Sequence, residues 1–305
     1  MKIFVTGGSG FLGGRLIQAL VARGDHVVAL ARSDEAARKV EALGATVARG
    51  DLDGVTGVAG CDAAIHSAAY VKELGTLAEF EHANVTGTKN VIAAVREAGV
   101  KRFVHVSTEA VLADGKPIVR ADETRPIPHK HWGAYGETKA RAEVLVRESG
   151  GIVVRPRLIW GRGDTSLMPQ LLDAVSHKRF AWVGGGTYLT STCNVANVVE
   201  GTLLALDKGI PGEVYFLTDG APIQAREFLT KLFATQGVDP GNRKVPYAIA
   251  KLVARATSWM KRPPVTKAAF AVGAHEVTVD DSKARRELGY EGRLSVQSGL
   301  DEMHR

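Results

Sequence analysis

The chain has 305 residues, 45% of them hydrophobic, so it can bury a large core as one big domain or as a domain with a smaller partner. Its 39 Lys and Arg against 33 Asp and Glu give a net charge of +6 that is spread along the chain, which suits an anionic cofactor and does not favour nucleic acid. The chain has only two cysteines, which argues against a disulfide scaffold and a Cys/His metal site. It has no charged and apolar leader and no run near ~18 apolar residues, which argues against an integral membrane segment. We therefore expect a soluble, cytoplasmic protein.

The first half of the chain alternates between strand-like and helix-like segments. Runs rich in β-branched residues occur at 2–6, 26–31, 45–49, 62–68, 102–107 and 151–156. Helical patterns lie between them, near 11–23, 34–43, 76–98 and 132–149. Continuous apolar strands separated by helices are typical of a parallel sheet covered on both faces. We therefore predict an α/β class, doubly wound Rossmann fold over residues 1–156.

The pattern changes after Pro156. A helix is expected at about 165–177, a glycine turn at 184–186, a helix at about 194–207 and a strand at 213–218. Residues from 223 onward look mostly helical and more basic. We expect residues 157–305 to form mainly a smaller α+β substrate domain, with segments near 187–220 returning to the Rossmann domain.

A glycine-rich stretch, VTGGSGFLGG, stands where the first strand should pass into the first helix. Gly7 would permit a tight turn, Gly10 would let a pyrophosphate approach the backbone, and Gly13 would let the helix pack close to the sheet. The helix N-terminus then stabilises negative charge. A glycine-rich turn can also be only a turn, but this position favours a dinucleotide site.

The end of the second strand should read the ribose of that dinucleotide. Arg32 offers a planar fork suited to a 2′-phosphate, with the hydroxyl of Ser33 beside it. An acidic residue there would instead bind the free 2′-hydroxyl of NAD. We favour NADP(H) over NAD(H). In the alternative, Arg32 stacks on adenine or lies in solvent, and Asp34 caps the next helix.

Tyr135 and Lys139 are four residues apart on a predicted helix, so both can point into one cleft. A nearby ammonium would lower the pKa of the phenol from its usual value of about 10. Such a tyrosine can exchange a proton with an alcohol while hydride moves at its carbon. Ser107 or Thr108, at the end of the fifth strand, could orient the substrate oxygen.

Taken together, these motifs resemble the extended short-chain dehydrogenase/reductase family, of the NAD-dependent epimerase/dehydratase superfamily, over nearly the whole chain. Within it, residues 155–219 are most similar to the 3β-hydroxysteroid dehydrogenase and dihydroflavonol reductase branch. The matching segments are Thr6–Gly13, Asp51-Leu52, His66–Ala69, Asn84–Asn90, Tyr135 with Lys139, and Arg155–Asp164.

This resemblance implies an NAD(P)-dependent alcohol dehydrogenase or carbonyl reductase that acts on a hydrophobic, sterol-like or flavonoid-like substrate. It makes Thr108 the catalytic hydroxyl, with Ser107 as its neighbour, beside Tyr135 and Lys139. The residues expected to bind the cofactor are Gly7, Gly10, Phe11, Leu12, Gly13, Arg32, Ser33, Asp51, Leu52, Ala68, Ala69, Tyr135, Lys139 and Pro156.

Two alternatives of function stay open. Sugar-nucleotide dehydratases of the superfamily carry Thr-Asp-Glu where this chain has Thr108-Glu109-Ala110, which argues against dehydration. Epimerases usually carry an asparagine where this chain has Arg157 to Trp160, so epimerisation is only the enzymatic runner-up. A non-catalytic NADP(H) sensor or complex subunit is the alternative of another class.

Several further features have a structural interpretation that we favour. Residues 246–264 form a basic amphipathic pattern that could touch a membrane surface, but we expect its apolar face to pack over the substrate pocket. The segments 76–98 and 132–149 resemble those through which family members form homodimers. His66 is expected to be structural, and core packing is favoured for Trp160, Met168, Trp182, Tyr188 and Leu189, which could otherwise line the pocket.

Overall fold

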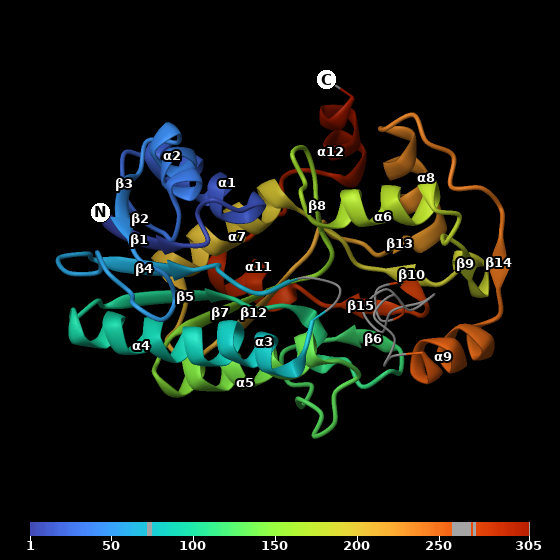
Figure 1. The fold of residues 1–305 in the computed structure, drawn as a ribbon, viewed down its shortest axis with the longest axis horizontal. Coiled ribbons are helices and arrows are strands. Elements are labelled where there is room, and N and C mark those ends of the chain that lie inside the picture. Colours follow the sequence, from blue (N-terminus) through green and yellow to red (C-terminus); the bar gives the residue numbers. More distant parts are fainter. Residues whose placement is uncertain (72–74, 258–269, 271–272, 305) are drawn as a thin grey trace.

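The computed structural model describes residues 1–71, 75–257, 270 and 273–304, and a seven-stranded sheet forms its centre (Figure 1). Every neighbouring pair in this sheet is parallel. The order is β12 (Val214–Leu217), β7 (Ile152–Pro156), β5 (Arg102–Val106), β4 (Ala63–His66), β1 (Lys2–Thr6), β2 (His26–Ala31) and β3 (Thr46–Arg49). The prediction of a doubly wound α/β fold is confirmed.

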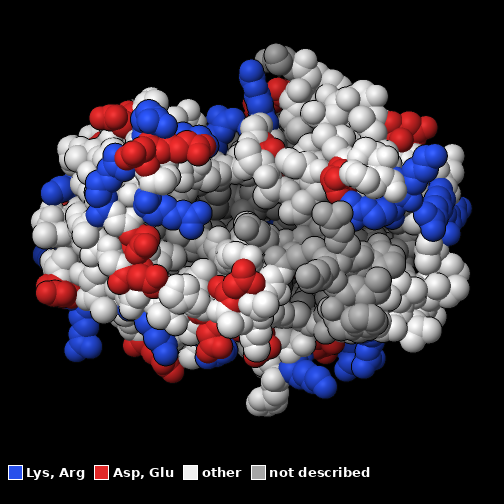
Figure 2. Space-filling view, viewed as in Figure 1, with Lys and Arg blue, Asp and Glu red and all other residues white. Residues whose placement is uncertain are grey.

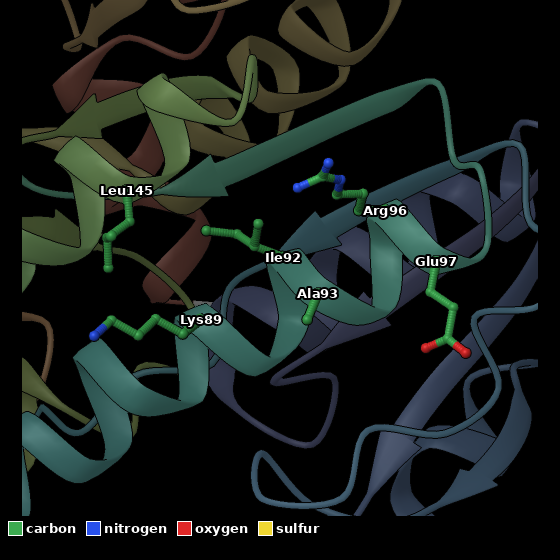
Figure 3. A pocket seen from close by; sticks show the side chains of 6 residues that line it. All are labelled: Lys89, Ile92, Ala93, Arg96, Glu97 and Leu145. Atoms are coloured by element: carbon green, nitrogen blue, oxygen red, sulfur yellow. The ribbon is translucent and has the colours of Figure 1, made fainter.

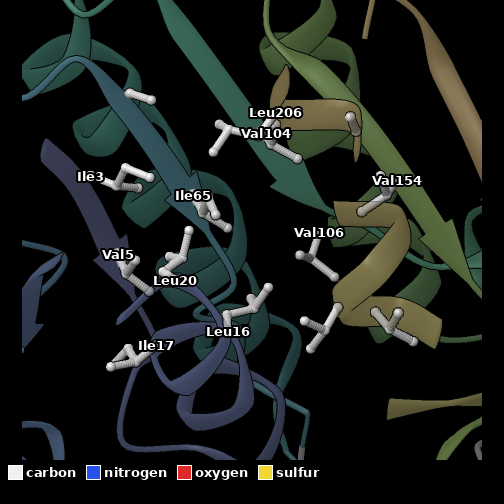
Figure 4. Close-up of a cluster of buried hydrophobic side chains, with 14 of the residues drawn as sticks. Ile3, Val5, Leu16, Ile17, Leu20, Ile65, Val104, Val106, Val154 and Leu206 are labelled. Atoms are coloured by element: carbon white, nitrogen blue, oxygen red, sulfur yellow. The ribbon is translucent and has the colours of Figure 1, made fainter. Parts of the chain in front are cut away.

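Helices cover both faces of this sheet (Figure 1). Along β1, Ile3 and Val5 point to one face and Phe4 to the other, as the two-residue period of a strand requires. Burial of each such side chain contributes about 1.5–3 kcal/mol. The first face carries α1 (Phe11–Ala22), α2 (Asp34–Ala42), α7 (Val195–Lys208) and α11 (Ser282–Leu288), and the second α4 (Gly87–Glu97) and α5 (Ala134–Glu148). Figure 4 shows some of the buried hydrophobic side chains between the first face and its helices.

The predicted helix at 76–98 is three consecutive helical segments. They are α3 (Leu77–Phe80), a π-helical stretch η1 (Glu81–Thr86) and α4. Within η1, the buried Asn84 accepts a hydrogen bond from Tyr70 N at 2.7 Å and donates one to Thr138 Oγ1 at 3.2 Å. The wider turn thus holds the loop after β4 against α5, and π-helical turns are frequent near functional sites.

The remaining elements form the smaller part of the molecule. A four-stranded sheet has the order β13 (Ile223–Gln224), β10 (Leu189–Thr190), β15 (Val277–Val279) and β6 (Ile118–Ala121). Two pairs join β11 (Cys193–Asn194) to β8 (Ile159–Trp160) and β14 (Lys244–Val245) to β9 (Trp182–Val183). The helices are η2 (Glu109–Leu112), α6 (Leu167–Ser176), η3 (Gly184–Gly186), α8 (Ala225–Ala234), α9 (Tyr247–Ala256) and α12 (Val296–Met303).

Of the five residues that could have lined a pocket, three are packed in the core as we expected. Trp160 is fully buried, packs edge-on against Phe228, and donates from Nε1 to Asp219 at 2.7 Å. Met168 belongs to the same cluster, and Trp182 is buried elsewhere. For Leu189 the expected core packing is wrong, because its side chain is exposed on β10. Tyr188 is half-buried and donates its hydroxyl to the Gly273 carbonyl.

Helix α9 buries Ala250 and Ala254 and leaves Ile249 and Leu252 exposed. Ile249 and Leu252 belong to the apolar pattern of 246–264 that we expected to pack over the pocket. That expectation is wrong for them, because small alanines and Tyr247 make the contact with Phe270 instead. Residues 258–264 of the predicted segment lie outside the described residues. None of the described helices is long and apolar enough to cross a membrane. On the face seen in Figure 2, basic and acidic side chains are interspersed.

Candidate active site

The turn after β1 is built for a close approach of the backbone. Gly7 has a φ of +75°, and a Cβ there would lie 2.7 Å from the amide nitrogen of Ala68. A Cβ on Gly13 would lie 2.0 Å from the carbonyl oxygen of Gly7. Gly10 is the N-cap of α1 and brings no side chain to cap it, so Phe11 and Leu12 begin the helix with amides free to bind an anion.

Strands β2 and β3 are parallel to β1 and end at the same carboxyl edge of the sheet as this turn. Arg32 follows β2 directly and is exposed. Ser33 caps α2 by accepting from Ala36 N at 3.2 Å, so the alternative in which Asp34 is the cap is wrong. Asp34 instead pairs with Arg49, at the end of β3, at 2.9 Å. Sequence analysis did not consider Arg49, which is a second guanidinium at this edge.

The other residues expected at the cofactor surround the same edge. Asp51 is exposed, and its Oδ1 accepts from the amides of Asp53 and Gly54, so it shapes the loop after β3. Leu52 is half-buried beside Gly87. Ala68 and Ala69 follow β4, and Pro156 ends β7.

His66 has the structural role that we expected. It is fully buried at the end of β4, where Nδ1 lies 2.6 Å from Thr6 Oγ1 and Nε2 lies 3.0 Å from Thr88 Oγ1. Burial, with the charge of Lys139, lowers the pKa of His66 to about 3. The imidazole is therefore neutral and ties β1, β4 and α4 together.

Tyr135 and Thr108 lie together at the carboxyl end of the sheet. Tyr135 is in the first turn of α5, half-buried, with its ring 6.4 Å from that of Phe80. Thr108 is buried just after β5, and a hydrogen bond with its side chain lowers the pKa of the phenol against the larger effect of burial. Ser107 donates to Glu143 at 2.8 Å instead. This geometry supports Thr108 over Ser107 as the partner of Tyr135.

Lys139 is buried one turn farther along α5. Its Nζ lies 2.7 Å from the carbonyl oxygen of Val106 and 3.0 Å from Nε2 of His105. Burial lowers the pKa of Lys139 to about 7, against the opposing charge of Glu143. Because the ammonium bonds inward, it does not act on the phenol as expected.

The pKa of Tyr135 is raised, by burial and then by the negative charge of Glu109. The expectation that Lys139 lowers it is wrong for this structure. The four-residue spacing correctly placed both groups on one helix, but His105, 34 residues away in sequence, holds the ammonium.

Sequence analysis missed two buried arginine–carboxylate pairs under this site. Arg155 binds Glu143 through Nε at 2.9 Å and through a second, shorter bond. Arg157 NH1 lies 2.9 Å from Glu109 Oε1. All four side chains are buried, although burying an ion pair is expensive. Only the segment RPRLIWG, with two arginines in a strand-like run, carried a signal for them.

These residues fit a dinucleotide cofactor. A pyrophosphate would be held by the amides between Gly7 and Gly13, because the chain there is packed too closely against Ala68 and Gly7 to admit a Cβ on either glycine. Arg32 would face the adenosine ribose, and Lys139 and Tyr135 the nicotinamide end. Among the described residues, no cluster of His, Cys, Asp or Glu could hold a metal ion.

A doubly wound sheet with this turn and this Thr, Tyr and Lys set defines an extended short-chain dehydrogenase/reductase. The sequence model of the 3-beta hydroxysteroid dehydrogenase/isomerase family matches residues 4–247, and the chain belongs to that family. It is an NAD(P)-dependent oxidoreductase.

Two curated relatives match over nearly their whole length. The 4-hydroxy-2-methyl-3-oxo-4-farnesyl-3,4-dihydroquinoline-1-oxide ketoreductase of Stigmatella aurantiaca is 52% identical, over 99% of this chain and 95% of the relative. A 2-alkyl-3-oxoalkanoate reductase of Stenotrophomonas maltophilia is 34% identical, over 98% and 97%.

Among solved structures, a dTDP-glucose 4,6-dehydratase from Streptomyces venezuelae with NAD bound superposes with a TM-score of 0.78. It is 23% identical and covers 100% of this chain and 96% of its own, which shows a shared fold.

Proposed function

We propose that this protein reduces a ketone on a hydrophobic substrate with NADPH, and that Tyr135 supplies the proton. The observation that supports the proposal is that the phenol of Tyr135 is beside Thr108 at the carboxyl edge of the sheet, the edge that also holds the glycine turn. The pKa of Tyr135 is raised, so the phenol is protonated at neutral pH, which is the form that carbonyl reduction requires.

The substrate class follows from the relatives. The Stigmatella enzyme is named for a ring ketone beside a carbon that carries a hydroxyl and a farnesyl group, and the Stenotrophomonas enzyme for a ketone beside an alkylated carbon. Both names describe an apolar chain next to the reacting carbonyl. A prenylated or alkylated ring ketone is therefore the first compound to test, ahead of sterols and flavonoids.

Each residue has a separate part in the proposed reaction. When bound, the nicotinamide cofactor supplies the hydride. Tyr135 donates its phenolic proton to the ketone oxygen as negative charge develops there. Lys139 would hold the ribose side, and the amides between Gly7 and Gly13 would hold the phosphates. Oxidation of the alcohol uses the same groups in reverse.

Arg32→Ala should weaken NADPH binding by about 10- to 100-fold and leave NADH binding nearly unchanged, because one charged hydrogen bond contributes roughly 1.5–3 kcal/mol. Fluorescence titration of both cofactors measures this. Arg49→Ala is the matched control, since Arg49 is an exposed arginine one strand away that already pairs with Asp34. Equal affinity of the wild type for the two cofactors would show that NADP(H) is not preferred.

The two alternatives predict different results in a substrate panel. An epimerase would convert a sugar nucleotide with NAD present and no net change in NADH. A sensor would bind NADPH tightly and turn over no ketone or alcohol. Steady NADPH consumption with a prenylated ring ketone, abolished in Tyr135→Phe, would support the reductase.

We further propose a homodimer through α4 and α5. Ile92, Ala93 and Leu145 line a shallow apolar hollow on these helices, with Lys89, Arg96 and Glu97 around it (Figure 3). A second copy would cover the apolar centre and pair the opposite charges of the rim.

Ala93→Arg should therefore shift the protein from dimer to monomer in light scattering, because a bulky charge would be buried among the residues that line the hollow. Ala22→Arg, the same change on an exposed position of α1, should leave the mass unchanged. A wild-type protein that is monomeric at high concentration would refute the proposed interface.

A further inference from the structure

His105 places a polar ring in the core beside Lys139. It is fully buried on β5, two residues after Phe103, and it therefore faces the side of the sheet that α4 and α5 cover. Its Nε2 lies 3.0 Å from Nζ of Lys139, and the carbonyl oxygen of Val106 lies 2.7 Å from the same Nζ. The ammonium of Lys139 thus has two neighbours that can each accept one of its protons.

The contact between His105 and Lys139 fixes where the protons of both groups are. A lysine ammonium donates three protons and accepts none, so Nε2 of His105 is the acceptor and carries no proton. The ring is neutral, because burial and the charge of Lys139 hold the pKa of His105 well below its usual range. Its one ring proton is therefore on Nδ1. Val106 and His105 take two protons of the ammonium, and no group among the described residues takes the third.

Histidine at position 105 has a cost that an apolar ring would avoid. Its Nδ1 is buried and has no hydrogen-bond partner among the described residues. A buried N–H group without a partner destabilises the fold, and a phenylalanine would fill a similar space without such a group. What histidine adds over phenylalanine at this position is an acceptor for the ammonium of Lys139.

We propose that His105 is a positioning residue that, with the carbonyl of Val106, holds two protons of the Lys139 ammonium and so directs the third toward the ribose of the bound cofactor. The proposal rests on the proposed role of Lys139 at that ribose. A free lysine side chain loses rotational freedom when it binds a ligand, whereas one that is already held loses little. His105 therefore contributes to cofactor affinity through Lys139, without itself having to touch the cofactor.

The neighbouring buried histidine, His66, differs from His105 in the nitrogen that carries its proton. The two lie opposite each other in register on β4 and β5, with ring centroids 5.0 Å apart. Thr88 donates its hydroxyl proton to the carbonyl oxygen of Asn84 at 2.6 Å. In the 3.0 Å contact between Thr88 Oγ1 and His66, Nε2 is therefore the donor, which leaves Nδ1 to accept from Thr6. His66 thus serves as an internal reference for His105.

The first test reads the protonated nitrogen of each ring by NMR of the wild-type protein labelled with nitrogen-15. At about pH 6, Lys139 is mostly protonated, since burial lowers its pKa only to about 7. We expect the proton on Nδ1 for His105 and on Nε2 for His66, with the signals assigned through contacts with neighbouring side chains. The same assignment for His105 is expected with NADPH bound. A proton on Nε2 of His105 in either state would overturn the proposal, because that nitrogen could not accept from the ammonium.

The second test is the affinity for NADPH, measured by fluorescence titration. His105→Phe keeps a ring and removes the acceptor, so NADPH should bind roughly 3- to 10-fold more weakly, the effect of one ordinary hydrogen bond. His105→Gln supplies an amide oxygen as acceptor and should restore most of the affinity. Unchanged affinity in a folded His105→Phe overturns the proposal. Tighter binding overturns it too, since His105 would then hold Lys139 away from the cofactor.

Phe103→Leu is the matched control for a loss of packing on this face of β5. Phe103 is a buried ring nearer the start of the same strand. Its variant should unfold at a lower temperature and bind NADPH as the wild type does. An equal loss of affinity in Phe103→Leu and His105→Phe would show that His105 acts only through the fold, which contradicts the positioning role.

Lys139→Met separates this proposal from the proposed function. Normal NADPH affinity in Lys139→Met would overturn the role of Lys139 at the ribose. The NMR spectrum of the wild type would still report on the contact between His105 and Lys139. If Lys139→Met weakens binding and His105→Phe does not, the role of Lys139 stands and the role of His105 is wrong.

Discussion

Replacing Tyr135 with phenylalanine is expected to lower kcat for ketone reduction by about 10²- to 10⁴-fold, the usual contribution of a positioned acid. The change removes one oxygen and keeps the ring that packs at 6.4 Å from Phe80. NADPH affinity should stay within a few-fold of the wild type, because the glycine turn and Arg32 are untouched. Steady-state rates and fluorescence titration of NADPH measure the two effects separately.

Tyr215→Phe is the matched control for this loss. Tyr215 is a buried tyrosine of the edge strand β12, two strands from β5, and its hydroxyl accepts from Ile210 N at 3.2 Å. Its variant should unfold at a somewhat lower temperature with an unchanged kcat. Equal losses of kcat in both variants would mean that the phenol of Tyr135 serves only the fold.

How far the site could be predicted depends on the sequence distance between its parts. The glycine turn and the Tyr135–Lys139 pair each occupy a few consecutive residues, and local geometry alone places them in the turn and on one helix. The parallel sheet was predictable for a related reason, since each of its strands is indicated by an apolar run of its own. Strand ends in the Rossmann half were therefore found to within one or two residues, as at β1 and β2.

What the sequence could not show are contacts made across long stretches of chain. Glu109 and Arg157 are 48 residues apart, and nothing in either neighbourhood marks them as partners. The same holds for Lys139 and His105, whose Nζ and Nε2 lie 3.0 Å apart although the two residues are 34 positions apart. Strand β6, whose sequence IVRA is short and half polar, is fixed only by its pairing with β15, so it was not predicted.

Gly13→Ala is expected to weaken NADPH binding by about 10- to 100-fold, the equivalent of the roughly 1–3 kcal/mol that overpacking costs. The new methyl group would lie 2.0 Å from the carbonyl oxygen of Gly7, so α1 must move away from the turn. That movement displaces the amides expected to hold the pyrophosphate. Titration of NADPH by fluorescence measures the loss, and thermal unfolding of the apoprotein measures how much of it comes from the fold.

Gly14→Ala separates this effect from the general cost of losing a glycine. Gly14 is the next residue of α1, and a Cβ there would meet only Leu43 Cδ1 at 3.4 Å and Gly8 O at 3.5 Å. Because alanine favours a helix by about 1 kcal/mol over glycine, this variant should be at least as stable as the wild type and should bind NADPH normally. If Gly13→Ala also bound NADPH normally, the turn would tolerate a wider gap between α1 and β1, and the pyrophosphate site would have to lie elsewhere on the sheet edge.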